Sequence, residues 1–109
     1  MSNSGAYREI EKHIVMSKES IKASIETEKG RIAQLRTTIA TLRSRKSEAS
    51  ARYAAKIAGA TQKGSKDSYR KEKASVIAHI ESEIRLKQSA LASHQQRIAS
   101  LRAMLKTAK

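Results

Sequence analysis

Histidine–carboxylate pairs are the combinations in this 109-residue sequence best suited to metal or acid–base chemistry. His79 and Glu83 stand four residues apart, which places both side chains on one face of a helix and supplies half of a metal site. One histidine and one carboxylate on an exposed helix are common by chance. We therefore expect no metal ligands and interpret this pair as part of a polar helix face.

Nucleophilic and phosphate-binding motifs are not evident. The fifteen serines have no histidine and acid arranged around them as a catalytic relay requires. The stretch AGATQKGSK has two glycines five residues apart followed by Ser-Lys, but its spacing departs from a P-loop and no strand precedes it. We expect no catalytic residues, no cofactor and no enzymatic activity.

Positive charge is concentrated near the middle of the chain. The formal net charge is +13, and residues 43–73 hold ten Lys or Arg against three acidic residues, a local net charge of +7. These ten residues, called the basic tip below, are Arg43, Arg45, Lys46, Arg52, Lys56, Lys63, Lys66, Arg70, Lys71 and Lys73. They suit nucleic-acid phosphates, an acidic protein or an anionic membrane surface, and cationic side chains also serve to solubilise a helical rod.

The composition indicates an all-α protein built from paired helices. Phe, Trp, Pro and Cys are absent and Tyr occurs only three times, so a thick globular core is not expected. Without Cys there are no disulfides or thiolate metal sites. No apolar run is long enough to span a bilayer, and the first residues lack the features of a cleaved signal. We expect a cytoplasmic protein, and export without a cleaved signal stays open.

Two heptad patterns, one on each side of the basic stretch, predict two coiled-coil helices. In the first pattern the seam, meaning the a and d positions, contains Ile14, Ile21, Ile25, Ile32, Leu35, Ile39, Leu42, Ala49 and Tyr53. In the second pattern it contains Ile77, Ile80, Ile84, Leu91, Ile98, Leu101 and Leu105. A narrow apolar stripe needs a partner, and the nearest partner of each stripe is the other one.

The sequence thus predicts a single antiparallel helical-hairpin domain over residues 1–109. Its first helix is expected at about 5–58, a basic bend at about 59–67 and its second helix at about 68–107. Gly59 and Gly64 are expected to supply the left-handed conformation that ends a helix, with Asp67 or Ser68 capping the next one.

The hairpin register makes two further predictions. It places His94 opposite residues 28–32, where a contact with Glu28 would form a polar layer that fixes the register, with a pH-sensitive element as a second interpretation. It also leaves the N-terminal residues with no facing residues on the second helix. We expect this overhang to bind a helical protein partner or a second copy, through Tyr7, Ile10, Ile14, Val15 and Met16.

About a hundred residues forming two helices around a glycine-containing bend resemble the WXG100 or ESAT-6-like proteins and the small helical partners of LXG toxins in type VII secretion. At the bend, where that family has Trp-x-Gly, this chain has Gln62-Lys63-Gly64, so only the glycine matches. The family's C-terminal export motif is absent from the ending RAMLKTAK. The resemblance implies a non-enzymatic targeting or chaperone-like partner of a larger secreted protein. The alternative is a basic nucleic-acid-binding or architectural protein that uses the basic tip.

Overall fold

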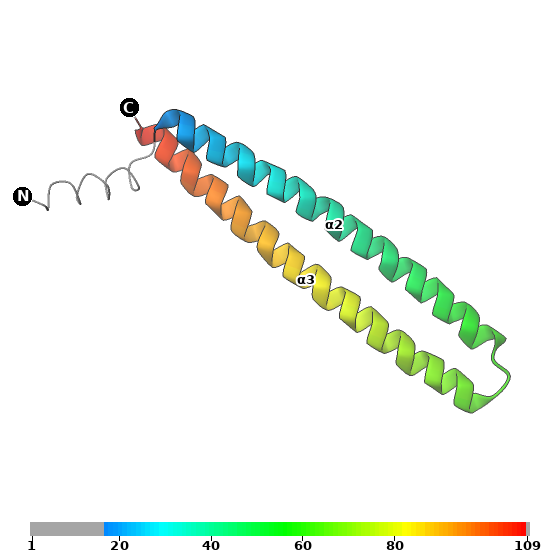
Figure 1. Cartoon of the computed structure of the whole chain (residues 1–109). Helices are drawn as coiled ribbons and strands as arrows, with labels where there is room; N and C mark the ends of the chain where they lie inside the picture. Colours follow the sequence, from blue (N-terminus) through cyan, green and yellow to red (C-terminus); the bar gives the residue numbers. More distant parts are fainter. Residues whose placement is uncertain (1–16, 109) are drawn as a thin grey trace, which may run out of the picture. The chain divides into compact units, whose positions relative to one another are not determined.

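The protein is all-α and consists of two long helices that pack against each other as an antiparallel hairpin (Figure 1). The computed structural model describes residues 17–108. Helix α2 spans Lys18–Gly59 and helix α3 spans Lys63–Thr107. Both helices are rich in Ala, Lys, Arg and Glu and lack Pro, a composition that favours long uninterrupted helices. The predicted fold class is therefore confirmed.

Helix α2 begins at Lys18 because Ser17 caps it. The backbone N–H of Ser20 donates to Ser17 Oγ at 3.2 Å, and the N–H of Ile21 donates to the Ser17 carbonyl at 2.9 Å. Glu19 adds an acidic group in the first turn, where the helix dipole favours negative charge. The part of the predicted first helix that precedes Ser17 lies outside the described residues.

The connection between the helices is shorter than the predicted bend and occupies only residues 60–62. At the end of α2 the N–H of Ala60 donates to the Ile57 carbonyl at 3.3 Å, which tightens the last turn. The N–H of Lys66 donates to the Gln62 carbonyl at 3.1 Å, so Gln62 already stands at the cap position of α3. Helix α3 therefore starts five residues before the predicted position near residue 68.

The glycine and capping predictions at the bend are wrong. No described residue has a positive φ, so neither Gly59 nor Gly64 supplies a left-handed conformation. Gly59 is the last residue of α2 and Gly64 lies in the first turn of α3. Asp67 lies inside α3, where its carboxylate pairs with Arg70 at 3.1 Å. Three residues are enough to connect the helices, so these local signals are not needed for the turn.

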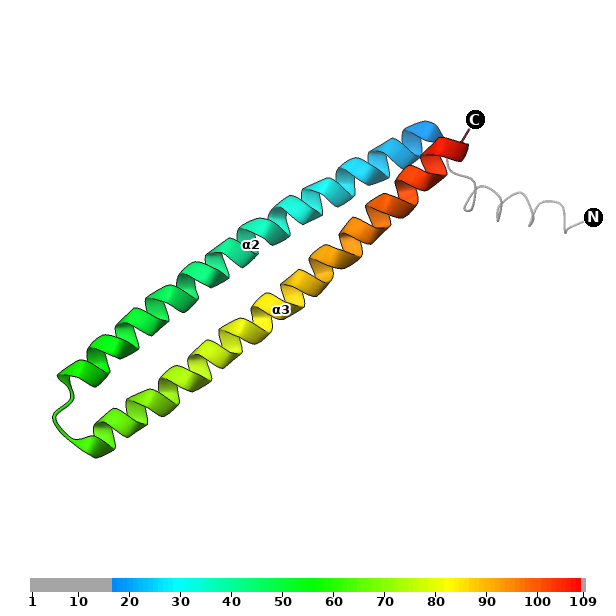
Figure 2. The same ribbon diagram turned by 180° about the vertical axis from the view of Figure 1, so that it is seen from behind.

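The described chain forms two compact units, each built from a segment of α2 beside a segment of α3 (Figure 2). Within the described residues, unit 1 contains 17–32 together with 93–108, and unit 2 contains Ala33–Ala92. Unit 2 includes the turn.

In unit 1 both helices contribute buried apolar side chains, namely Ile21, Ile25, Ile32, Ile98 and Leu101. In unit 2 all the buried side chains, Ile39, Leu42, Ala49 and Tyr53, belong to α2. The predicted seam of α2 is thus confirmed at these positions, with Leu35 half-buried. Among the seam residues of α3, Ile77, Ile80, Ile84, Leu91 and Leu105 are only half-buried. Ile14 lies outside the described residues.

Candidate functional site: the basic tip

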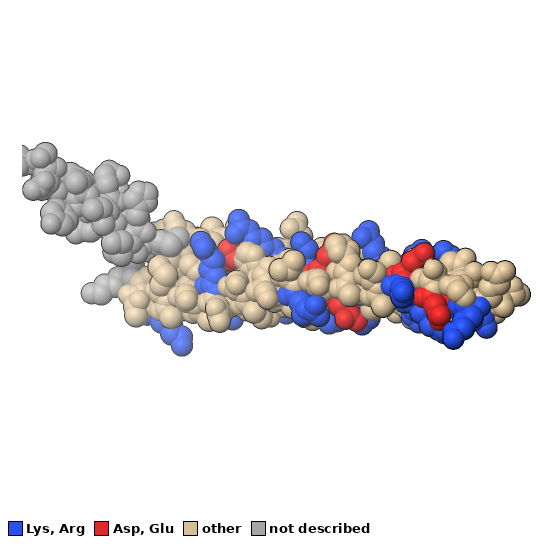
Figure 3. Space-filling model, turned by 90° about the horizontal axis from the view of Figure 1, so that it is seen from below, with Lys and Arg blue, Asp and Glu red and all other residues tan. Residues whose placement is uncertain are grey.

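All ten residues of the basic tip lie in unit 2, on the helix segments that adjoin the turn. Five come from the last five turns of α2 and five from the first three turns of α3, which is within roughly 25 Å of the turn along either helix axis. Figure 3 shows Lys and Arg atoms gathered, with a few acidic groups among them, near the end of unit 2 that carries the turn. The structure therefore brings the predicted basic residues together around one end of unit 2.

Two of the ten cations form ion pairs with other residues of the described part of the chain. Lys46 Nζ lies 3.1 Å from Glu81 Oε1 and joins α2 to α3, while Arg70 Nη1 lies 3.1 Å from Asp67 Oδ1 within α3. The side chains of Lys46 and Glu81 are 42% and 40% exposed. Exposed pairs of this kind contribute about 0.2–1 kcal/mol. These contacts lower the local charge without anchoring the helices strongly.

Two further cations cover the aromatic rings of unit 2. Lys56 Nζ lies 5.1 Å from the ring centre of Tyr53 on α2 and 5.7 Å from that of Tyr69 on α3. The Arg52 guanidinium lies 5.6 Å from the Tyr53 ring. Each such cation–π contact is worth about 0.5–1 kcal/mol at an exposed site. Since the Tyr53 side chain is also buried in the seam, its ring face is committed to contacts inside the hairpin.

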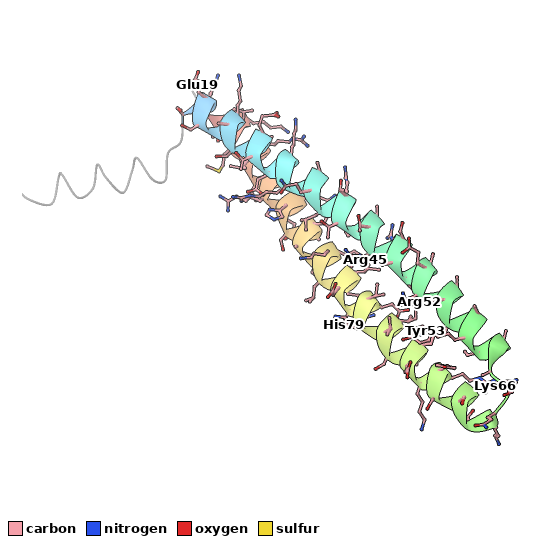
Figure 4. All side chains as sticks on the ribbon, turned by 45° about the vertical axis from the view of Figure 1, so that its right-hand side comes forward. Glu19, Arg45, Arg52, Tyr53, Lys66 and His79 are labelled. Carbon is pink, nitrogen blue, oxygen red and sulfur yellow. The ribbon has the colours of Figure 1, made fainter. Side chains whose placement is uncertain are left out.

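The remaining six cations of the basic tip make no ion pair with any residue between 17 and 108. They are Arg43, Arg45, Lys63, Lys66, Lys71 and Lys73. Figure 4 shows Arg45, Arg52 and Tyr53 along α2 and Lys66 beside the turn. The first turn of α3 contains no acidic residue, although a helix N-terminus favours negative charge. The structure thus leaves unneutralised positive charge on both helices near the turn.

A second cluster of charged groups, in unit 1, surrounds Glu28, whose side chain is only 2% exposed. Arg31 Nη1 donates to Oε1 of this carboxylate at 3.0 Å, and Arg97 Nε forms an ion pair with the same oxygen at 3.1 Å. His94 Nδ1 forms a hydrogen bond with Oε2. The contact between His94 and Glu28 confirms the predicted polar layer, which joins α2 to α3.

The two arginines around Glu28 were not among the residues predicted from the sequence. Arg31 follows Glu28 by three residues and Arg97 follows His94 by three residues, so each lies one helical turn from a residue of the predicted pair. The hairpin register that predicted the contact of Glu28 with His94 could therefore also have predicted that both arginines lie near Glu28. Their side chains are more than half exposed, at 54% and 65%, and they close over the carboxylate from the solvent side.

The pKa of the Glu28 carboxyl lies below its ordinary value of 4.5. Burial acts in the opposite direction and by itself raises this pKa, because it disfavours the charged form. The hydrogen bond with His94 and the positive charges of the three basic partners outweigh burial. Glu28 is therefore ionised at neutral pH and balances the charge of residues from both helices.

The predicted pair of His79 and Glu83 is present, with Nε2 and Oε1 3.0 Å apart. The His79 side chain is exposed and lies on α3 (Figure 4). Between residues 17 and 108 no group of three His, Asp or Glu side chains is placed to hold a metal ion. No helix in this part of the chain is both long and apolar enough to cross a membrane.

The predicted partner-binding residues Tyr7, Ile10, Ile14, Val15 and Met16 lie outside the described residues, so their role stays a prediction. Comparison with protein-family models, curated proteins and solved structures finds no match for the chain. What the structure does support of the resemblance described above is its coarse architecture, a two-helix hairpin of about this length.

Proposed function

We propose that this chain is a non-enzymatic interaction protein whose hairpin pairs with a helix of another protein. The observation that supports this proposal most directly is the asymmetry of unit 2. Every buried side chain there belongs to α2, while the seam residues Ile77, Ile80, Ile84 and Leu91 of α3 are half-buried. The apolar stripe of α3 in unit 2 is therefore only partly covered by the chain itself.

Apolar residues outside this seam point to where a further helix would lie. Leu86 is 70% exposed, and Val76 is half-buried. At 100° per residue, Val76 lies about 40° from Ile80 around the axis of α3, and Leu86 lies about 80° further in the same direction, so both are on the same flank of the seam. A helix packed along this flank would remove apolar surface from water at about 25 cal/mol per Å². It would also enlarge a core that two helices alone make thin.

The charge of the chain favours a different protein over a second copy as the partner. Unit 2 holds thirteen Lys or Arg against five acidic residues, and pairing it with the same unit of another copy would oppose like charges. A helix with an apolar stripe and acidic flanks would match both the apolar surface and the charge. We therefore propose an acidic amphipathic helix as the partner, with self-association as the competing outcome.

A finer form of this proposal is a small targeting or chaperone-like partner of a larger secreted protein, as in type VII secretion. It rests on the length of the chain and its hairpin architecture alone. In this form the predicted N-terminal residues, including Val15 and Met16, would add a second contact to the one on α3.

The proposal is tested by affinity capture from the native cells with two matched double variants. Val76→Glu with Leu86→Glu places two charges on the proposed flank of α3. Ala74→Glu with Ala92→Glu adds the same charges at exposed positions on another face of α3. We expect a partner captured by the unmodified chain to be kept by the alanine-site variant and lost by the flank variant, at equal helicity by circular dichroism.

Retention of the same partner by the flank variant would contradict pairing through α3. A partner lost instead on Val15→Glu with Met16→Glu would place the contact at the N-terminal residues alone. Sedimentation of the purified chain distinguishes the remaining case, because a stable oligomer would show that the apolar flank is covered by a second copy.

A further inference from the structure

We propose that the basic tip is a binding site for the phosphate backbone of duplex nucleic acid, a function beyond the helix pairing proposed above. The starting observation is the difference between cations that are neutralised and cations that are not. Arg31 and Arg97 in unit 1 share the carboxylate of Glu28. In unit 2, eight cations of the basic tip have no acidic partner among residues 17–108, and six of these eight also make no cation–π contact there.

Unpaired like charges at this density oppose folding of unit 2. Residues 43–73 have a net charge of +7, and charges closer than the Debye length of about 8 Å at physiological ionic strength repel one another. Solubility alone is served as well by cations interspersed with acidic residues. Concentration of the unpaired cations around one turn is thus a cost to stability that a bound polyanion would relieve.

The start of α3 adds a second, independent cost. Lys63 and Lys66 lie in its first turn, which contains no acidic residue. The N-terminal end of a helix has a partial positive charge, so ammonium groups there are unfavourable and an anion is favourable. Negative charge brought to the turn from outside the chain would therefore be stabilised by both lysines and by the helix itself.

The aromatic residues of unit 2 argue for duplex backbone rather than single strands. Proteins that bind single strands stack bases on exposed aromatic rings. The Tyr53 ring is buried and covered by Arg52 and Lys56, and the Tyr69 ring is covered by Lys56. Cations without a stacking surface recognise phosphates alone, which makes the expected binding independent of sequence.

The turn itself argues against a membrane or a protein as the occupant of the basic tip. Residues 60–62 are Ala, Thr and Gln, so the turn offers no large apolar side chain to insert into a bilayer or to fill a pocket on a protein partner. Among residues 17–108 the one large apolar side chain that is mostly exposed, Leu86, lies on α3 beyond the basic tip.

The test measures fluorescence anisotropy of a labelled 30-base-pair DNA duplex with the full chain between 50 and 200 mM KCl. Six phosphate contacts predict a slope of log K against log salt of about −5, and thus a loss of affinity on the order of a thousandfold across this range. Affinity that is undetectable at 50 mM, or that does not change with salt, would overturn the proposal.

Two variants with the same net charge locate the site. The tip variant carries Arg45→Gln, Lys63→Gln, Lys66→Gln and Lys71→Gln. The control variant loses four exposed cations elsewhere, through Arg36→Gln, Arg85→Gln, Lys87→Gln and Arg102→Gln. We expect the tip variant to lower the magnitude of the salt slope by about three to four and the control variant to leave it nearly unchanged. Equal losses in both would show that net charge, and not the basic tip, attracts the duplex.

Competitors then identify the class of polyanion. A single-stranded oligonucleotide, polyglutamate and anionic phospholipid vesicles are added at equal total charge to the bound duplex at 100 mM KCl. We expect the unlabelled duplex to displace the probe more effectively than any of the three. Stronger displacement by the single strand would contradict backbone recognition of a duplex, and stronger displacement by polyglutamate or vesicles would assign the basic tip to an acidic protein or a membrane surface.

Discussion

Unit 1 and unit 2 are built from the same two helices, yet they differ in how fully those helices cover each other. In unit 1, α2 and α3 both contribute buried apolar side chains, among them Ile21 and Ile98. In unit 2 only α2 does, and the facing seam of α3 stays half-buried. A heptad pattern on both helices is thus compatible with close packing in one unit and loose packing in the other.

The two units also treat charge differently. Unit 1 places an ionised carboxylate in the seam and surrounds Glu28 with three basic groups from both helices. Unit 2 has a pair of exposed side chains, Lys46 and Glu81, and several unpaired cations around the turn. Charge in unit 1 therefore fixes the pairing of α2 with α3, whereas charge in unit 2 is available to other molecules. These contacts support a structural role for unit 1, and recognition is the role proposed above for unit 2.

The largest expected effect is on the free energy of unfolding, and it compares isoleucine at two positions of α3, one in each unit. Ile98 is 7% exposed in unit 1, and Ile84 is half-buried in unit 2. We expect Ile98→Ala to lower the free energy of unfolding by about 2–4 kcal/mol and Ile84→Ala by about 1 kcal/mol, because less apolar surface is buried at Ile84. Urea unfolding followed by circular dichroism measures both values.

Equal losses for the two isoleucine variants would show that the seam of unit 2 is as well covered as that of unit 1. The support for a further helix on α3 would then disappear. A smaller loss for Ile84→Ala that grows to match that of Ile98→Ala in the presence of the captured partner would sharpen the comparison, because the partner would complete the seam.

The sequence predicted the buried face of α2 and the opposition of Glu28 and His94, because a 3.5-residue repeat and an antiparallel register depend only on spacing. It did not predict that Ile77 and Ile84 stay half-buried, since the pattern identifies the face of α3 that meets α2 but not how closely the helices approach. It also placed the start of α3 too late. Asp67 and Ser68 are good cap residues, but a three-residue connection made an earlier start at Lys63 available.

The clustering of the ten cations of the basic tip was predictable from the sequence, but which of them are paired with another side chain was not. Sequence identified all ten cations because they are close in the chain. Whether a given cation is free depends on side chains that approach from the other helix, as Glu81 approaches Lys46 and Tyr69 approaches Lys56. A long flexible side chain can reach several such neighbours, and the local sequence does not determine which of them it contacts.

A second prediction concerns how the stability of unit 1 depends on pH through the carboxylate of Glu28. Because the pKa of Glu28 is lower in the folded chain than its ordinary value of 4.5, the ionised carboxylate stabilises the fold fully above that pH. This contribution is lost as the pH falls through the folded-state pKa. We expect Glu28→Gln to lower the melting temperature at pH 6, and the difference from the unmodified chain to shrink steadily below pH 4.5.

The control for the acid prediction is Glu81→Gln, which removes a carboxylate from the exposed pair of unit 2. It should lower the melting temperature less than Glu28→Gln does at pH 6, since exposed pairs add little. A constant difference between the Glu28→Gln variant and the unmodified chain from pH 6 to pH 3 would mean that Glu28 stabilises unit 1 by packing alone. The statement that charge fixes the pairing of α2 with α3 in unit 1 would then be wrong.

The smallest expected effect concerns Gly30, in the part of α2 that belongs to unit 1. A Cβ added at Gly30 would meet no atom within 4 Å, and the same is true at Gly59. Gly30 lies inside the helix and Gly59 is its last residue. We therefore expect Gly30→Ala to raise the free energy of unfolding by about 1 kcal/mol and Gly59→Ala to raise it less, because an alanine gains most in a helix interior. Urea unfolding of both variants measures the difference. If Gly30→Ala stabilises the chain but abolishes capture of its partner, the backbone at Gly30 is a contact surface, and recognition would then extend into unit 1.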